Sequence, residues 1–214
     1  FYLLGSFRLG YLSVNLKQKK YDFLNLDNQS VKDRNFNYLS TSIGIRKLFN
    51  KFEINGWIMN TMKAPQIEEL FSDGPHLGSY SYEIGEPNLS LEKIYGVESA
   101  IKYSSSPIKI SLTTFYNYSP YYFQMTKVGE CVDLNLQECL ENGYIQAGVG
   151  SSGWLYRYKI KGVESLMRGL EYNLSYDFKR FSFRYDFSLV SGDNLTNNLP
   201  LAYVNPDKQV LNID

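Results

Sequence analysis

The side chains best suited to chemistry in this 214-residue chain lie in two short stretches, 64–98 and 130–141. His76, in the first stretch, is the single histidine, which excludes most histidine-based catalytic schemes and any multi-histidine metal cluster in this chain. Glu69 and Glu83, with Glu68, share its segment, and such carboxylates either line a ligand entrance or are simply hydrated. Because no Gly-rich phosphate loop or nucleophile motif is visible, we do not expect an enzyme.

Two cysteines, Cys131 and Cys139, mark the second stretch, which reads E-C-V-D-L-N-L-Q-E-C. They are close enough in sequence to close a small disulfide loop, which an oxidising compartment would permit. A zinc site is the alternative, but zinc normally requires four ligands and no further Cys or His is nearby. The acidic neighbours are Glu130, Asp133, Glu138 and Glu141. A solvated loop explains these carboxylates as well as a cation would, so we favour the disulfide and expect neither a metal nor a cofactor.

The composition is balanced in charge, with 22 basic and 22 acidic residues, and rich in aromatic residues, with 19 Tyr. A nucleic-acid-binding surface would require a basic stripe or patch, and the basic residues here are scattered. No run of about 20 apolar residues is present, so no helical membrane span is expected. The elements that position the candidate residues must therefore be sought in shorter patterns.

Apolar and polar residues alternate with a period of two in several stretches, which predicts β-strands with two different faces. The clearest stretches are 95–103, 108–118, 170–178 and 181–189. All charged residues in these stretches lie on the polar face. A Lys or Arg facing lipid at mid-bilayer costs roughly 2–4 kcal/mol, so a membrane barrel must keep its outer face free of charge. A soluble sandwich would also hide charge from its core, so the alternation alone leaves both folds open.

The connections between the expected strands alternate between short and long. Short turns are expected near 49–51, 104–107 and 179–180, and long links near 17–36, 64–92, 127–155 and 193–206. Outer-membrane barrels have this arrangement, whereas a compact soluble domain with so many long links would be unusual. We therefore predict an all-β fold, an antiparallel segment of a transmembrane β-barrel.

The expected strands run near 7–16, 38–48, 52–62, 95–103 and 108–123, followed by one ending at Phe178 and one starting at Phe181. A further strand begins near 209–214. In the first strand the apolar phase switches from Phe7, Leu9 and Tyr11 to Leu12, Val14 and Leu16, which indicates a bulge or a misassigned strand. Tyr121, Tyr122 and Phe123 could stack on a ligand or sit in the aromatic girdle at a membrane interface, and we favour the girdle.

The stretch 64–98 resembles a signature segment of TonB-dependent outer-membrane receptors. The family pattern runs approximately R-A-P-x-x-x-E-L-F-S-x-G-P-H-x-G-x-x-x-Y-E-I-G-N-P-N-L-x-x-E-x-S. The matching residues are Ala64, Pro65, Glu69, Leu70, Phe71, Gly74, Pro75, His76, Glu83, Ile84, Gly85, Pro87, Asn88, Leu89 and Glu92. Lys63 and Glu86 depart from the pattern at polar loop positions. Weaker echoes are Phe115-Tyr116-Asn117, Gly169-Leu170-Glu171 and Leu199-Pro200-Leu201.

The resemblance implies a twenty-two-stranded barrel with an N-terminal plug, of which residues 1–214 would be the later middle. The plug, the remaining strands and the motif that contacts TonB would lie outside this segment. The chain begins at Phe1 without an initiator Met or export signal, so we expect a fragment.

The function implied by the resemblance is active transport across the outer membrane of a Gram-negative bacterium. Such a receptor captures a scarce small-molecule or metal-complex substrate, such as a ferric siderophore or haem, and imports it with energy delivered by the TonB complex of the inner membrane. Its partners would be this substrate, the TonB complex and outer-membrane lipid, without nucleic acid. The alternative is a barrel without transport, acting as an adhesin or surface interaction protein, and a plug domain upstream would separate the two.

The outer loops of such receptors capture the ligand, so the candidate substrate residues are Glu69, His76, Tyr80, Tyr82 and Glu83. Tyr80 and Tyr82 would either stack on a ligand or sit in the interfacial aromatic girdle. For His76 we favour a role in loop structure over direct ligand binding, because its Pro75-His76 setting matches the family loop.

Overall fold

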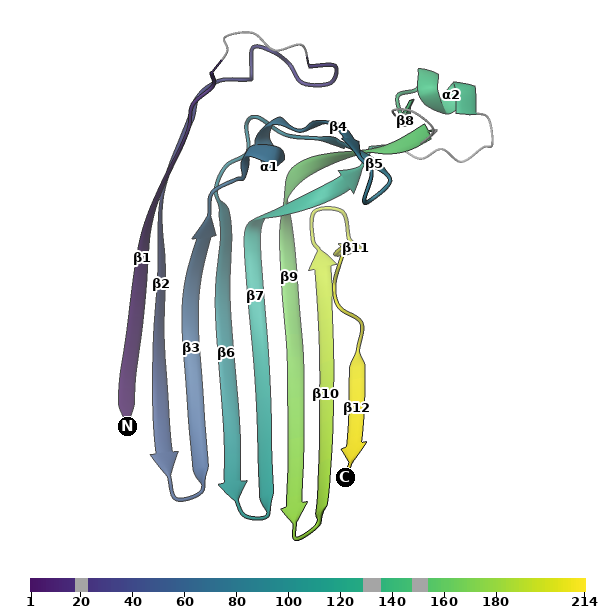
Figure 1. Ribbon diagram of the computed structural model, residues 1–214. Coiled ribbons are helices and arrows are strands. Elements are labelled where there is room, and N and C mark those ends of the chain that lie inside the picture. Colours follow the sequence, from purple (N-terminus) through teal and green to yellow (C-terminus); the bar gives the residue numbers. More distant parts are fainter. Residues whose placement is uncertain (18–22, 129–135, 148–153) are drawn as a thin grey trace.

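Most of the chain forms one open, antiparallel sheet (Figure 1). The computed structural model describes residues 1–17, 23–128, 136–147 and 154–214. In spatial order the long strands are β1 (Tyr2–Val14), β2 (Arg34–Phe49), β3 (Phe52–Lys63), β6 (Glu92–Ser105), β7 (Ile108–Lys127), β9 (Trp154–Phe178) and β10 (Phe181–Asn194). The short β12 (Lys208–Ile213) pairs with the outer side of β10. The predicted all-β antiparallel architecture is confirmed.

The short connections lie together at one end of the sheet and the long links at the other (Figure 1). The hairpin turns between β2 and β3 and between β9 and β10 each contain a residue with positive φ, Asn50 at 51° and Lys179 at 53°. Each predicted strand has a counterpart in the sheet, although β1, β2, β6 and β7 extend beyond the predicted bounds. We call the end with the long links the outer end.

One face of the sheet, which we call the apolar face, carries rows of aliphatic and aromatic side chains. Ile58 lies opposite Ile43 and Val97, and Ile101 lies opposite Leu112. Ile58 is 68% exposed, so this row meets no second layer within the described chain. Aromatic rings gather at the short-turn end, where the ring centroid of Phe52 lies 5.6 Å from Phe49 and 5.0 Å from Tyr103.

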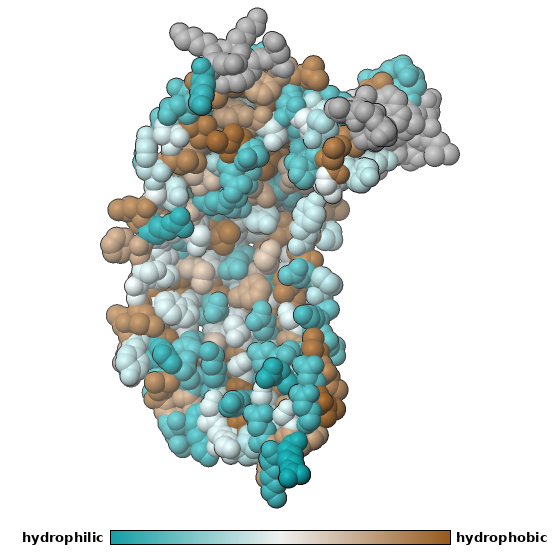
Figure 2. Space-filling view, in the orientation of Figure 1, coloured by the Kyte–Doolittle hydropathy of each residue, from teal (hydrophilic) through white to brown (hydrophobic). Residues whose placement is uncertain are grey.

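The opposite face, which we call the mixed face, carries polar residues together with aromatic rings. Asn117, Glu98 and Lys102 are on it, as the alternation predicted. On the face shown in Figure 2, hydrophilic and near-neutral residues dominate the middle of the sheet, and apolar residues project at the edge where β1 lies. The ring of Phe115 lies over Gly169, where an added Cβ would come within 2.4 Å of it. Two of the weaker family-like motifs, Phe115-Tyr116-Asn117 and Gly169-Leu170-Glu171, therefore contact each other in the sheet.

The two explanations predicted for the phase switch in the first strand, a bulge or a misassigned strand, are both wrong. β1 pairs with β2 in an unbroken register from Tyr2 to Val14. The apolar phase switches because the strand changes the face that it buries: Phe7 and Leu9 are exposed on the apolar face, whereas Val14 is buried on the mixed face. Interruptions of register occur instead between Lys93 and Tyr95 and between Ser119 and Tyr122.

The long links contain secondary structure that the sequence did not predict. They hold α1 (Ile67–Phe71), β4 (Asp73–His76), β5 (Ser81–Ile84), α2 (Leu136–Glu141), β8 (Ile145–Ala147) and β11 (Leu199–Pro200). β4 and β5 form a hairpin, and β5 runs parallel to the outer end of β9. Among the described residues, no helix is long and apolar enough to cross a membrane.

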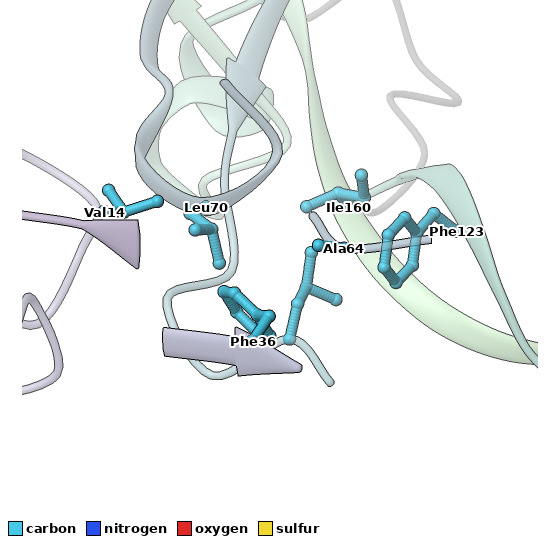
Figure 3. Close-up of a cluster of buried hydrophobic side chains, with 7 residues drawn as sticks. Val14, Phe36, Ala64, Leu70, Phe123 and Ile160 are labelled. Carbon is cyan, nitrogen blue, oxygen red and sulfur yellow. The ribbon is translucent and has the colours of Figure 1, made fainter. Parts of the chain in front are cut away.

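A hydrophobic core forms where the link between β3 and β6 folds onto the mixed face (Figure 3). Leu70 of α1 is fully buried and packs with Phe36 and Val14 from the ends of β2 and β1. A second cluster joins Tyr82 and Ile84 of β5 to Leu26 and Leu155. These two cores hold the link that carries the candidate residues against the sheet.

Candidate functional site

The segment 64–91, which we call the signature segment, begins with a tightly bonded turn. Ala64 and Pro65 are buried. The backbone N–H of Gln66 donates to Glu69 Oε2 at 2.7 Å, which satisfies one of the free donors at the start of α1. Glu69 Oε1 lies 2.9 Å from the Lys63 ammonium. The carboxylate of Glu69 therefore has a structural role before any ligand is considered.

Gly85 closes the signature segment against α1. Its N–H donates to Ser72 O at 2.7 Å, and the next N–H, of Glu86, donates to Glu69 O at 3.0 Å. A Cβ on Gly85 would lie 2.6 Å from the backbone C and O atoms of Leu70. Only glycine allows this approach of two backbones.

Arg34, at the start of β2, fixes the later part of the segment. Its guanidinium donates to Pro87 O and, at 2.7 Å, to Leu89 O, and it lies 5.0 Å from the centre of the Phe36 ring. Leu89 is fully buried. Several residues that match the family pattern therefore have a structural role, because their contacts hold this segment against the sheet.

The tip of the β4–β5 hairpin presents His76 and Tyr80 to solvent. His76 Nδ1 lies 2.7 Å from Ser79 Oγ, and Glu83 accepts hydrogen bonds from Ser79 and Ser81 at 3.2 and 3.0 Å. The His76 side chain is nevertheless 62% exposed, and Tyr80 is 73% exposed with φ of 50°. The tip is ordered by its own polar bonds while both rings remain accessible.

Tyr82 has a different environment from its neighbours. The side chain is 4% exposed, and its hydroxyl donates to Asp73 Oδ1 at 3.2 Å. Burial, and then the negative charge of Asp73, raise the pKa of the Tyr82 phenol. A ring buried in this way does not fit the stacking role expected for Tyr82.

A cavity of about 280 Å³ lies between the signature segment and the outer ends of β7 and β9. Three carboxylates of the signature segment, those of Glu68, Glu69 and Glu83, line it. The rest of the lining includes Ile84, Tyr122, Phe123, Met125, Ile160, Met167 and Tyr203. Of the predicted substrate residues, the structure thus brings Glu69 and Glu83 to this cavity, and His76, Tyr80 and Tyr82 lie outside its lining.

The placement of Tyr122 and Phe123 corrects the prediction of an interfacial girdle. Phe123 is 9% exposed in the first core, Tyr121 packs against that core, and Tyr122 lines the cavity. The cause is the change of register between Ser119 and Tyr122, after which strand β7 bends over the sheet (Figure 1). Pro120, which cannot donate to a ladder, was the signal in the sequence that could have located this interruption.

Cys139, in α2, is buried and disulfide-bonded. Cys131 lies outside the described residues, so the predicted pairing of the two stays a prediction. Among the residues that the structure describes, no group of three or more His, Cys, Asp and Glu side chains is arranged to hold a metal ion.

The comparisons with known proteins point to one family. A family model described as "TonB dependent receptor-like, beta-barrel" matches residues 1–214. No match was found among curated proteins.

Similar solved structures include one transporter and two receptors. The copper transporter OprC has a TM-score of 0.72 at 14% identity, over 99% of this chain and 29% of that chain. The Serratia marcescens hemophore receptor HasR, in complex with its hemophore HasA and heme, gives 0.58 at 14% identity, over 99% and 37%. The Acinetobacter baumannii siderophore receptor PirA gives 0.55 at 16% identity, over 85% and 27%. At these identities the likeness shows the fold, and the chain spans 27–37% of the length of these proteins.

Proposed function

Because the chain belongs to the TonB-dependent receptor family through its β-barrel, we propose that it forms part of the wall and outer mouth of an outer-membrane receptor that imports a scarce substrate. The observation that carries the proposal is the match of the family model over the whole chain. The complete protein that we propose would also contain the plug, the remaining strands and the motif that contacts TonB. The TonB complex of the inner membrane would supply the energy for import.

The dimensions of the apolar face support a place in the outer membrane. Arg168 and Asp193 form an ion pair of 3.7 Å toward the outer end, and Arg168 lies opposite Tyr116 in the ladder. Phe178 and Phe181 lie opposite each other at the short-turn end. At about 3.3 Å per residue and a tilt of about 40°, the stretch from Arg168 to Phe178 spans about 25 Å, which is the height of the apolar band of such barrels. The apolar face would then contact lipid and the mixed face would line the lumen.

The cavity at the outer mouth is the proposed point of first ligand contact. It combines carboxylates of Glu68 and Glu83 with the ring of Tyr122 and the thioether of Met125. Polar groups on an otherwise apolar wall are typical of small-molecule sites. His76 and Tyr80 stand nearby on the exposed hairpin tip of the same segment and would meet the ligand before it enters.

The proposed substrate is a metal complex, such as a ferric siderophore or haem. The relatives are named for copper transport, a siderophore, and a hemophore with heme, so the proposal extends what they share to this chain. The alternative function, a surface adhesin without transport, requires the same wall but no coupling to TonB.

Uptake by the complete protein tests the proposal. The complete gene would be expressed in a Gram-negative host that lacks its own receptors for metal complexes, and the cells would be supplied in turn with ferric siderophores, haem and copper. We expect uptake of one of these classes, and we expect it to disappear in a host without TonB. Surface expression without uptake of any of them, together with adhesion to cells or matrix, would favour the adhesin.

A pair of matched substitutions connects uptake to the cavity. Glu68→Gln removes a charge from the cavity lining, whereas Glu141→Gln removes one from exposed α2. We expect the first to change the concentration that gives half-maximal uptake by about threefold or more and the second to leave it unchanged. Equal effects would place ligand contact elsewhere.

A further inference from the structure

Asp73, the first residue of β4, joins two links that are distant in the sequence. One carboxylate oxygen accepts the N–H groups of Leu24 and Asn25 at 2.6 and 2.8 Å. The other oxygen accepts Asn25 Nδ2 at 2.7 Å and the Tyr82 hydroxyl at 3.2 Å. An ionised carboxylate only accepts hydrogen bonds, and here its donors come from both the β1–β2 link and the β4–β5 hairpin.

Asn25 extends the network to a third link. Its Nδ2 also lies 3.3 Å from Gln146 Oε1 in β8, and its side-chain oxygen accepts a bond from Arg157 of β9. Arg157 donates in turn to Gly143 O, just after α2, at 2.8 Å. We call Asp73, Asn25 and Arg157 the link hub, because the described parts of the β1–β2, β3–β6 and β7–β9 links meet there.

The link hub is attached directly to the wall of the cavity. Asp73 lies opposite Ile84 in the β4–β5 ladder, and Ile84 and Glu83 line the cavity. β5 also pairs with residues 156–159 of β9, which include Arg157. Beneath the hub, Tyr82 and Leu26 pack in the second core. A movement of the hairpin would therefore disturb the hub and the cavity together.

We propose that Asp73 is a positioning residue that couples the described parts of the three outer links, so that their structure beside the cavity is kept or lost together. The proposal rests on the proposed function in one respect, namely that the cavity receives the ligand. In a coupled unit the hub bonds of all three links break together. Independent links would lose their hub bonds one at a time.

The coupling depends on the Asp73 carboxylate because this single group accepts hydrogen bonds from several donors in different links. Asp73→Asn keeps the shape of the side chain but replaces one accepting oxygen by an amide that donates, so two donors face each other. Asp33 offers a matched control, since its carboxylate accepts the N–H of Leu16 at 2.8 Å and both residues belong to the β1–β2 connection. The same substitution there removes a charge within one link and leaves an oxygen that can still accept this bond.

Hydrogen exchange of the complete receptor in detergent, without ligand, tests the coupling. For Asp73→Asn we expect exchange to become about tenfold faster at amides of all three links, including Asn25, Glu83 and Arg157, while β2 and β3 keep their protection. Asp33→Asn should change exchange only near its own link. Faster exchange confined to the hairpin, with the other two links unaffected, would overturn the proposal.

A reciprocal double variant keeps the test independent of simple misfolding. Asp73→Asn with Asn25→Asp returns a donor–acceptor pair at the centre of the hub and places a carboxylate beside Arg157. We expect it to restore part of the protection in all three links, and no recovery in any of them would count against the hub. Because exchange is measured without ligand, coupled exchange in a protein that imports nothing would overturn the proposed function and leave the hub intact.

Discussion

The wall of the sheet and its outer mouth are stabilised in different ways. In the wall, residues such as Ile58 and Val97 are exposed on the apolar face, and the strands are held by continuous ladders between neighbours. At the mouth, Leu70 and Leu89 are fully buried and distant links meet in hydrophobic cores. In the proposed outer-membrane barrel, the solvent of the apolar face would be lipid, whereas the mouth is stabilised by buried cores in the way that a small water-soluble domain is.

The wall and the mouth of the same chain therefore owe their stability to different interactions. Between lipid and protein there is little hydrophobic driving force, so the apolar face contributes by avoiding charge and not by excluding water. The mouth contributes through burial, at about 25 cal/mol per Å² of apolar surface, and through bonds to otherwise unpaired backbone groups. Substitutions should therefore affect one region without the other.

The largest effect is expected for charge on the apolar face. Leu112→Asp would place a carboxylate opposite Ile101 in the lipid band, at a cost of about 2 kcal/mol, and would impair assembly of the barrel. Its neighbour Ser111 is on the mixed face, opposite Lys102. Ser111→Asp should therefore be tolerated. Heat-modifiable migration of the protein from outer membranes measures assembly, and equal losses for both variants would contradict the assignment of the two faces.

The second effect should be confined to the mouth. Gly85→Ala brings a Cβ to within 2.7 Å of Phe71 N as well as to Leu70, so the backbone of the signature segment must shift, at a cost of about 1–3 kcal/mol. We expect faster proteolysis of this segment while heat-modifiable migration stays normal. Gly74→Ala is the matched control, because a Cβ there meets no atom within 4 Å. A loss of assembled barrel for Gly85→Ala would show that the mouth and the wall fold as one unit.

A smaller effect of the same kind is expected at Arg34. Arg34→Met retains an apolar stem against Phe36 but leaves the carbonyl groups of Pro87 and Leu89 without their donor, at a cost of about 1–2 kcal/mol. Hydrogen exchange near residues 86–90 should accelerate. Arg8→Met, at an exposed position on β1, should change nothing in this region. Unaltered exchange at 86–90 would mean that the cores alone hold the segment.

The sequence predicted the wall far better than the mouth, for a physical reason. A strand with two different faces can be recognised from alternation, which needs only neighbouring residues, as in Ile108 to Tyr118. The mouth depends on contacts such as Asp73 with Asn25, 48 residues apart, or Arg157 with Asn25, 132 residues apart. No local pattern encodes such pairs.

The residues that line the cavity differ in the same way in how far the sequence could locate them. Glu68, Glu69 and Glu83 could be placed at an entrance because they share one segment of the sequence, and they do line one cavity. The opposite wall of that cavity, with Tyr122 and Met167, comes from strands whose outer ends bend after a change of register. This wall of the cavity could be located only from the folded structure.

The smallest expected effect is the response of the mouth to acid. Burial opposes ionisation of Glu86, but the Lys159 ammonium at 2.9 Å and the N–H of Asn88 outweigh it, so the pKa of Glu86 is lowered from its ordinary value of 4.5. A lowered pKa in the folded state means that the ion pair stabilises the protein above about pH 4.5 and that this contribution disappears as the pH falls through the lowered value. The pair is partly exposed, so the loss should stay below about 1 kcal/mol and shrink in salt.

Hydrogen exchange around Glu86, corrected for the intrinsic rate at each pH, measures this response. We expect protection to fall between pH 6 and pH 3.5 in the wild type and to be low at both pH values in Lys159→Met, whose residual change with pH should be smaller. The apolar face carries no comparable pair in the stretches 95–103 and 108–118, so exchange in the middle of β6 and β7 should not depend on pH in this range. An acid response in those strands equal to that at Glu86 would show that the mouth and the wall are coupled more strongly than their separate contacts imply.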